Sequence, residues 1–172
     1  NKTFSDTTVV VRSSSYLEDS FHQSNAGAFE SILNINPRDK KSITKAINTV
    51  IKSYSNHSSL EETNHQVLIQ EMVREVLMSG VVLTKDMETG APYYVISYDD
   101  TTTRTDTVTS GTSKDIKTVL INKSFKITSL DEPFCKLIES VKEVEDTTSY
   151  DSLDIEFAIN QQNEIYILQV RP

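Results

Sequence analysis

Four polar residues near the carboxyl end of the chain have the types and spacing to hold a charged ligand. The segment 154–171 is rich in β-branched and aromatic residues, which predicts two strands joined by a tight turn at Gln162-Asn163. With that turn, Asp154 lies opposite Arg171, and Glu156 lies opposite Gln169. Directly opposed side chains in antiparallel strands approach to within about 5.5 Å at their Cβ atoms. Strict alternation also places four residues of the second strand on one face: Ile165, Ile167, Gln169 and Arg171.

Two kinds of chemistry fit this hairpin. A carboxylate and an amide oxygen, as in Glu156 and Gln169, suit a hard cation such as Mg²⁺, which also takes oxygens from phosphates and water. The guanidinium of Arg171 suits the phosphate itself, through its planar fork of donors. The alternative is an exposed Asp154–Arg171 ion pair with the other two side chains in solvent, and such pairs contribute little to stability. The hairpin alone leaves both interpretations open.

Composition limits the class of protein that carries this hairpin. The chain has 172 residues, 37% of them hydrophobic and 24% charged, which predicts a folded protein of one domain or two small lobes. The net charge of -8 argues against general nucleic-acid binding, and no apolar run is long enough to predict a membrane span. The single cysteine, Cys135, excludes an intrachain disulfide and fits a reducing compartment, so we expect a cytoplasmic protein.

The remaining elements follow an α+β pattern. Apolar residues at helical spacing predict helices over 42–54, with Ser42 as N-cap, and over 132–146. The polar segment 15–29 and the Thr-rich segment 99–115 are expected to be loops. Strands are predicted at 7–12, 29–35, 65–73, 80–86, 92–98 and 116–123, in addition to the closing hairpin.

Six blocks of the sequence resemble one known family, in the order in which that family carries them. The blocks are VVVRSSSYLEDSFHQSNAGAFESILNI, VLIQEMV, SGVVLTKDMETG, VTSGTSKD, DIEFAI and ILQVRP. Together they span Val9 to Pro172 and resemble the nucleotide-binding core of the phosphoenolpyruvate synthase and pyruvate phosphate dikinase family. The closing Gln-x-Arg-Pro is the most specific of these matches.

The resemblance implies an ATP-grasp-like fold, in which two lobes with antiparallel sheets and flanking helices hold ATP and Mg²⁺ between them. Residues 1–172 would form one nucleotide-binding domain, with about 1–60 in the first lobe and 61–172 forming the hinge, the second lobe and the closing hairpin. In such enzymes a diphosphate unit leaves ATP for a histidine on a separate swivelling domain. The three histidines of this chain do not lie in a phosphohistidine motif, so the partner would be a phosphohistidine or acceptor domain outside this chain.

The resemblance also assigns roles to individual residues. Arg12 and Arg171 match the catalytic arginines that bind the phosphates, and Asp154 would support Arg171. Glu156 and Gln169 match metal ligands. The remaining nucleotide-binding residues would be Gly27, Ala28 and Ser31 in the loop over the phosphates, and Gln70, Glu71, Met72 and Val73 in the hinge strand whose backbone meets adenine.

The sequence departs from the family pattern at two segments, so the resemblance does not by itself predict catalytic activity. The family's Gly-Gly-Lys-Gly stretch, which supplies a phosphate-binding lysine, would precede the first residue of this chain. Its Gly-Leu-Gly-Glu segment, expected after Tyr98, is replaced by DDTTTRTDT. Three hypotheses follow: the ATP-binding domain of a dikinase-type phosphotransferase; a catalytically degenerate nucleotide-binding or protein-interaction module on the same fold; or an unrelated Thr-rich β module.

Overall fold

The chain folds into two compact units, residues 1–74 and 75–172, in the computed structural model. The structure describes residues 7–15, 19–20, 23–24, 30–54, 65–102 and 115–172. Within these residues the two main sheets are antiparallel and are accompanied by two α-helices, which confirms the predicted α+β class. Neither helix has the length and apolar character needed to cross a membrane, in the parts of the chain described.

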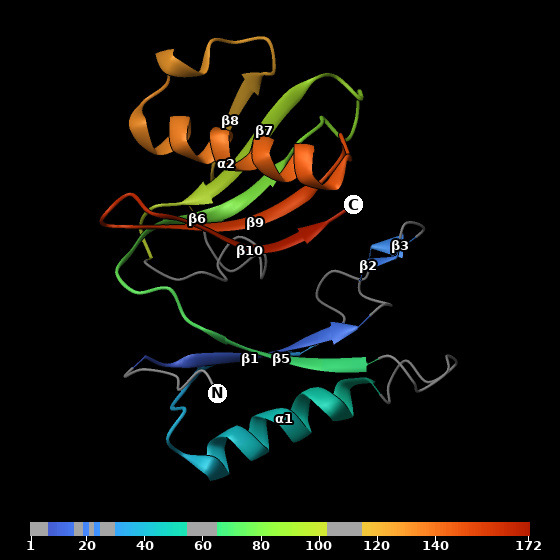
Figure 1. Cartoon of the computed structure of the whole chain (residues 1–172), viewed down its shortest axis with the longest axis vertical. Helices are drawn as coiled ribbons and strands as arrows, with labels where there is room; N and C mark the ends of the chain where they lie inside the picture. The colour runs from blue at the N-terminus through green and yellow to red at the C-terminus, as the bar shows by residue number, and fades with distance from the viewer. Residues whose placement is uncertain (1–6, 16–18, 21–22, 25–29, 55–64, 103–114) are drawn as a thin grey trace. The chain divides into compact units, whose positions relative to one another are not determined.

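The first unit is a three-stranded sheet with a helix on one face (Figure 1). Its elements are β1 (Val9–Ser15), β4 (Ser31–Ile35), α1 (Lys40–Tyr54) and β5 (His65–Glu71), with a separate pair of short strands, β2 (Asp19–Ser20) and β3 (Gln23–Ser24). The strand order is β4-β1-β5, so β1 lies at the centre. The core of this unit consists of Val11, Ala46, Val50 and Tyr54, which are buried between α1 and the sheet.

The end of α1 also connects the two longer strands of this sheet. The Tyr54 hydroxyl donates a hydrogen bond to the Gln66 carbonyl in β5 and accepts one from the Ser14 amide in β1, at 3.2 Å. The ring of His65 stacks on the Tyr54 ring, with 4.5 Å between centroids. These contacts hold β1 beside β5 at the end where β5 begins.

The start of α1 differs from the prediction. The helix begins at Lys40, and the carboxylate of Asp39 accepts hydrogen bonds from the backbone amides of Lys41 and Ser42, at 3.0 and 3.3 Å. Asp39 therefore caps the helix, and the prediction of Ser42 as N-cap is wrong. The two lysines between them extend the first turn into solvent, because a helix does not need apolar residues there.

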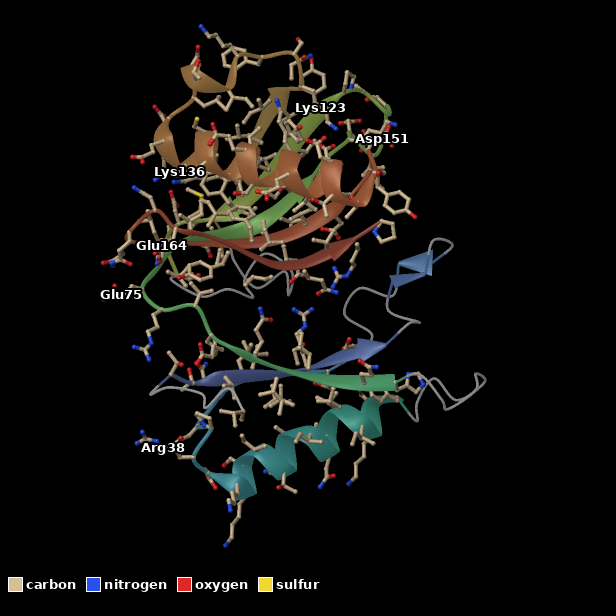
Figure 2. The ribbon with its side chains drawn as sticks, in the orientation of Figure 1. Arg38, Glu75, Lys123, Lys136, Asp151 and Glu164 are labelled. Atoms are coloured by element: carbon tan, nitrogen blue, oxygen red, sulfur yellow. The ribbon has the colours of Figure 1, made fainter. Side chains whose placement is uncertain are left out.

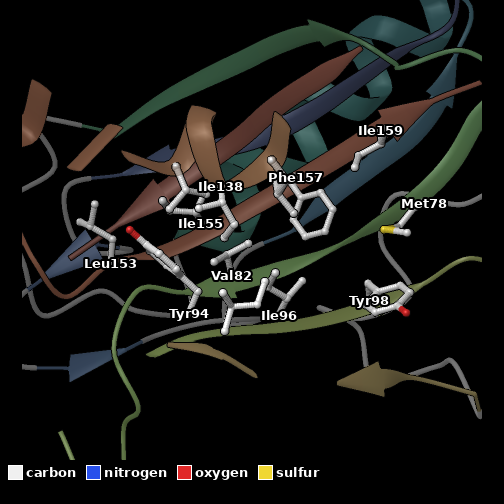
Figure 3. Close-up of a cluster of buried hydrophobic side chains, with 13 residues drawn as sticks. Met78, Val82, Tyr94, Ile96, Tyr98, Ile138, Leu153, Ile155, Phe157 and Ile159 are labelled. Atoms are coloured by element: carbon white, nitrogen blue, oxygen red, sulfur yellow. The ribbon is translucent and has the colours of Figure 1, made fainter. Parts of the chain in front are cut away.

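The second unit is a five-stranded sheet with the order β10-β9-β6-β7-β8. Its elements are β6 (Val76–Leu83), β7 (Tyr93–Asp99), β8 (Lys117–Asn122), the 3₁₀ helix η3 (Ile127–Ser129), α2 (Glu132–Thr148), β9 (Asp154–Asn160) and β10 (Ile165–Arg171). Helix α2 lies across one face of this sheet (Figure 1). Leu137, Ile138 and Val141 of the helix are fully buried against Ile155 and Phe157 of β9, in the cluster of Figure 3.

Two features fix this sheet and its helix in place. Gly80 lies where β6 and β7 approach closely, since a Cβ atom there would be 2.1 Å from the carbonyl oxygen of Ser97. Glu145 of α2 accepts a hydrogen bond from the buried Tyr94 hydroxyl at 2.8 Å and pairs with Lys123, which is labelled in Figure 2. The helix is thus joined to β7 and to the segment after β8 by charged and neutral hydrogen bonds as well as by apolar contact.

Candidate functional site in the closing hairpin

The closing hairpin brings together the four polar residues singled out in the sequence. In the β9–β10 pair, Glu156 is directly opposite Gln169, and Asp154 is directly opposite Arg171. Both cross-strand pairs agree with the pairing predicted from the sequence. They lie on the face of the sheet opposite to α2, because the alternate residues Ile155, Phe157 and Ile159 of β9 point into the core.

The loop that connects the two strands is longer than predicted, and a β-bulge in β10 restores the predicted pairing. Asn160 is the last residue of β9, its amide donates to the Glu164 carbonyl at 3.2 Å, and residues 161–163 form the loop with Asn163 at φ 57°. The prediction of a two-residue turn is therefore wrong. A three-residue loop shifts the register by one, and a β-bulge between Ile167 and Gln169 shifts it back.

The bulge also corrects the predicted faces of β10. Ile165 and Ile167 pair with Ile159 and Phe157 and pack against the core, whereas Gln169 and Arg171 lie on the other face. Strict alternation placed all four on one face. Leu168 is the extra residue, and leaving it out of the sequence restores perfect alternation of apolar and polar residues from Ile165 to Arg171. That pattern was a readable signal for the bulge.

Arg171 is held by both carboxylates of β9. Its Nη2 atom lies 3.1 Å from Glu156 Oε1, and its Nη1 atom lies 3.5 Å from Asp154 Oδ2. The side chains of Arg171 and Glu156 are each 13% exposed and that of Asp154 is 33% exposed. Water therefore screens the Arg171–Glu156 attraction less than it would screen a surface ion pair, and it screens the Arg171–Asp154 attraction to an intermediate degree.

Asp154 has one oxygen atom that no described residue satisfies. Its Oδ1 atom is buried and accepts no hydrogen bond from the residues that the structure describes. Burial raises the pKa of this carboxyl group above its ordinary value, and the nearby Arg171 partly opposes the shift. A buried carboxylate oxygen without a donor is costly, so this position favours a further positively charged or hydrogen-bonding group.

Thr84 positions the start of β9. Its side chain is fully buried, and its hydroxyl donates to the Asp151 carbonyl at 3.1 Å and accepts from the Leu153 amide at 2.8 Å. Its own amide donates to the Leu153 carbonyl at 2.9 Å. These three hydrogen bonds fix the residue directly before Asp154. The pairing of Leu83 with Asp154 continues the same contact into the sheet.

In the first unit, two of the predicted phosphate-binding residues are cross-strand neighbours. Arg12 of β1 is directly opposite Ser31 of β4 and Leu68 of β5. All three lie on the face of the sheet away from α1, because the adjacent Val11 is fully buried against the helix. The predicted residues Gly27 and Ala28 lie outside the residues that the structure describes.

The predicted hinge segment forms the end of β5 and the residues after it. Gln70 pairs with Val10, and the amide of Met72 donates to the Thr8 carbonyl at 3.0 Å. Since antiparallel partners exchange backbone hydrogen bonds at alternate residues, the amide and carbonyl of Glu71 point away from β1. This orientation directs them toward the edge of the sheet, because β5 is the last strand in the order β4-β1-β5 among the described residues.

A further contact near the hinge was not predicted from the sequence. Asn34 adopts a left-handed backbone conformation, with φ 59°, next to an irregularity in the pairing of β1 and β4. Its amide donates to the sulfur of Met72 at 3.2 Å. Asparagine is one of the few residues that adopt this conformation readily, so the Leu-Asn pair near the end of the strand was a possible signal.

Comparison with known proteins identifies a family for the first part of the chain. No curated protein is a significant match. A family model, "Pyruvate phosphate dikinase, AMP/ATP-binding domain", matches residues 1–99 of the 172. The match therefore includes β1, β4, β5, β6 and β7 but ends before the closing hairpin. It confirms the family inferred from the sequence: the chain belongs to the AMP/ATP-binding domain family of pyruvate phosphate dikinase.

Proposed function

We propose that this chain is the ATP-binding part of a dikinase-type phosphotransferase. It would bind MgATP in an ATP-grasp-like fold and pass phosphate to a histidine or another acceptor outside the chain. The two lobes would correspond to the two compact units, residues 1–74 and 75–172. The family match supports nucleotide binding, and the transfer reaction is the proposal.

One observation carries the proposal beyond nucleotide binding. Outside the stretch matched by the family model, β9 and β10 place Glu156 beside Gln169 and Arg171 beside Asp154 on one sheet face. An oxygen-donor pair suits a hard metal ion, and the partly buried arginine next to it suits a phosphate. An incidental surface ion pair does not need the amide of Gln169 opposite the second carboxylate.

The residues present fit a magnesium ion. Glu156 and Gln169 offer a carboxylate and an amide oxygen from adjacent strands, and Asp154 has a buried oxygen that accepts no hydrogen bond from the described residues. Mg²⁺ is bound by one or two carboxylates together with water and phosphate oxygens, so a small donor set of this kind is sufficient. When bound, the ion would neutralise charge on the phosphates.

The chain's own residues would act by position and charge. Arg171 would hold the phosphates through its planar fork of donors, with Asp154 fixing the orientation of that fork. Arg12, with Ser31 beside it, would bind phosphate from the first unit. The backbone of Glu71 would meet the adenine edge. Phosphoryl transfer needs little covalent chemistry from the protein, so such positioning and electrostatic stabilisation supply most of the catalysis.

Isothermal titration with ATP, with and without Mg²⁺, tests the metal role. Glu156→Gln should weaken binding in the presence of Mg²⁺ by about tenfold or more, because a charged metal ligand is lost, and should change binding of ATP alone much less. Glu143→Gln, on the exposed surface of α2, is the control for the change in charge. Equal losses with and without Mg²⁺ would refute a metal role for Glu156.

Arginine substitutions in the first unit test the phosphate role of Arg12. Arg12→Ala should lower ATP affinity by about tenfold or more, since hydrogen bonds to charged groups contribute roughly 1.5–3 kcal/mol each. Arg38→Ala is the matched control, because Arg38 lies in the exposed segment before α1 (Figure 2). If both substitutions change affinity equally, Arg12 has no specific role.

A catalytically degenerate nucleotide-binding module is the second candidate, and one observation favours it. After β7, the buried carboxylate of Asp99 accepts hydrogen bonds from the amides and hydroxyls of both Thr101 and Thr102, at 2.7–3.1 Å. These amides point at a carboxylate, whereas a glycine-rich segment would leave its amides available to phosphate. Micromolar MgATP binding that is insensitive to changes at Glu156 and Arg171 would favour this candidate.

A further inference from the structure

Arg171 contacts the carboxylate that is the proposed metal ligand, and this contact has to break before a metal ion can bind there. Its guanidinium lies 3.1 Å from the same carboxylate, Glu156, that is the proposed metal ligand. Both side chains are 13% exposed, so little water screens the interaction. A divalent ion on Glu156 would therefore meet a full positive charge on its own ligand, and repulsion at such distances is strong where water is scarce.

The second carboxylate gives the arginine another partner. Asp154 contacts the other terminal nitrogen of Arg171, at 3.5 Å, from the position directly opposite in the adjacent strand. The guanidinium can therefore release Glu156 while it keeps Asp154. An anion that approaches the released nitrogen atom would replace the lost carboxylate and complete the fork.

We propose that Arg171 is a built-in counter-ion that keeps divalent metal ions off Glu156 until the phosphates of a nucleotide draw its guanidinium away. This inference rests on the proposed function, because it assigns Glu156 and Arg171 to the same site. The Arg171–Glu156 contact makes metal and nucleotide binding cooperative, because either ligand must break this contact and thereby favours binding of the other. Such coupling is reciprocal. Metal alone binds weakly, although two carboxylates and an amide lie together.

The test measures binding of Mn²⁺ alone, without nucleotide, from the electron paramagnetic resonance signal of the free ion. Arg171→Met should bind Mn²⁺ about tenfold more tightly than the original chain, because the competing charge is gone. Arg171→Lys should lie between the two, since a lysine keeps the charge but cannot contact two carboxylates with a planar fork. Lys85→Met is the charge-matched control and should leave Mn²⁺ affinity unchanged, because Lys85 pairs with the exposed Asp151 at 3.1 Å, in an ion pair separate from that of Glu156.

The outcomes separate this inference from the proposed function. If Arg171→Met binds Mn²⁺ within twofold of the original chain, the counter-ion role is overturned, whatever the affinity for MgATP. If the original chain fails to bind MgATP while Arg171→Met gains Mn²⁺ affinity, the counter-ion contact stands and the proposed function falls. Urea unfolding checks that each variant is folded. If Arg171→Met does not fold, Arg171→Gln, which also removes the charge, decides the test by the same criterion.

Discussion

Deletion of Leu168 is expected to leave the closing hairpin folded and its polar pairs intact. Leu168 is the extra residue of the β10 bulge, so without it Gln169 still pairs with Glu156 and Arg171 still pairs with Asp154 in a regular ladder. Its side chain is half-buried and is not part of the main core. Full burial of a leucine contributes about 1.5–3 kcal/mol, so the deletion should cost about 1 kcal/mol in the free energy of unfolding.

Deletion of Val170 is the matched comparison, because it removes one residue from the regular part of the same strand. Arg171 then moves to the core face, since a shift of one residue reverses the faces of a strand. The two carboxylates of β9 lose their cation, and the core loses the packing of Val170. Breaking a buried ion pair costs about 3–5 kcal/mol; discounted for the partial exposure of Asp154, a loss of roughly 2–4 kcal/mol is expected.

Urea unfolding of the two deletion variants and the original chain provides the measurement, and Mn²⁺ and MgATP titrations follow on the folded variants. The expected order of stability is original chain, then the Leu168 deletion, then the Val170 deletion. If the Leu168 deletion is as unstable as the Val170 deletion, the bulge is required for folding of the sheet. In that case Leu168 is more than an inserted residue, and the reasoning about the faces of β10 is refuted.

Two further predictions concern the sheet and its helix. Gly80→Ala should destabilise the second unit by about 3 kcal/mol, because the added Cβ atom would lie 2.1 Å from a backbone oxygen of β7. Gly90→Ala should cost only about 1–2 kcal/mol, because Gly90 has φ 69° but no atom within 4 Å of the added Cβ. Thermal unfolding compares the two variants. Tyr94→Phe should cost about 1–2 kcal/mol through the lost hydrogen bond to Glu145. Burial and the hydrogen bond to Glu145 raise the pKa of Tyr94 above its ordinary 10.0. Tyr94 therefore contributes to the free energy of unfolding below about pH 10, and this contribution is lost as the pH rises above that value. Unfolding followed between pH 8 and pH 11 should show this loss in the original chain and a smaller loss in Tyr94→Phe, and identical profiles would contradict it.

The cross-strand pairs of the hairpin could be predicted from the sequence because they depend on local alternation. The faces of Ile165 and Ile167 could not be predicted under strict alternation, since a single inserted residue changes them. The cap of α1 was misassigned for a similar reason: Asp39 precedes two lysines, and the apolar periodicity that marked the helix begins only after Ser42. Local sequence patterns therefore predict where helices and strands occur more accurately than they predict the residues at which these elements begin and end.

The position of β9 between β6 and β10 required information that no local pattern contains. Residues 76–83 and 154–160 are far apart in the sequence, and their register depends on packing against α2 and on Thr84. The surroundings of Glu156 and Asp154 in the sheet, which include Val81 and Leu83, follow from that register. The proposed site could therefore be predicted as a set of residues, but its burial could not.

The location of β10 at the edge of its sheet affects how long the proposed site stays assembled. In the part of the chain that the structure describes, β10 has one neighbouring strand, β9, so it can separate from the sheet in a local fluctuation that leaves the main core intact. Gln169 and Arg171 would leave together in such an event. Amide hydrogen exchange in β10 should therefore be faster than in the central strand β6, and a ligand that bridges the hairpin should slow it selectively.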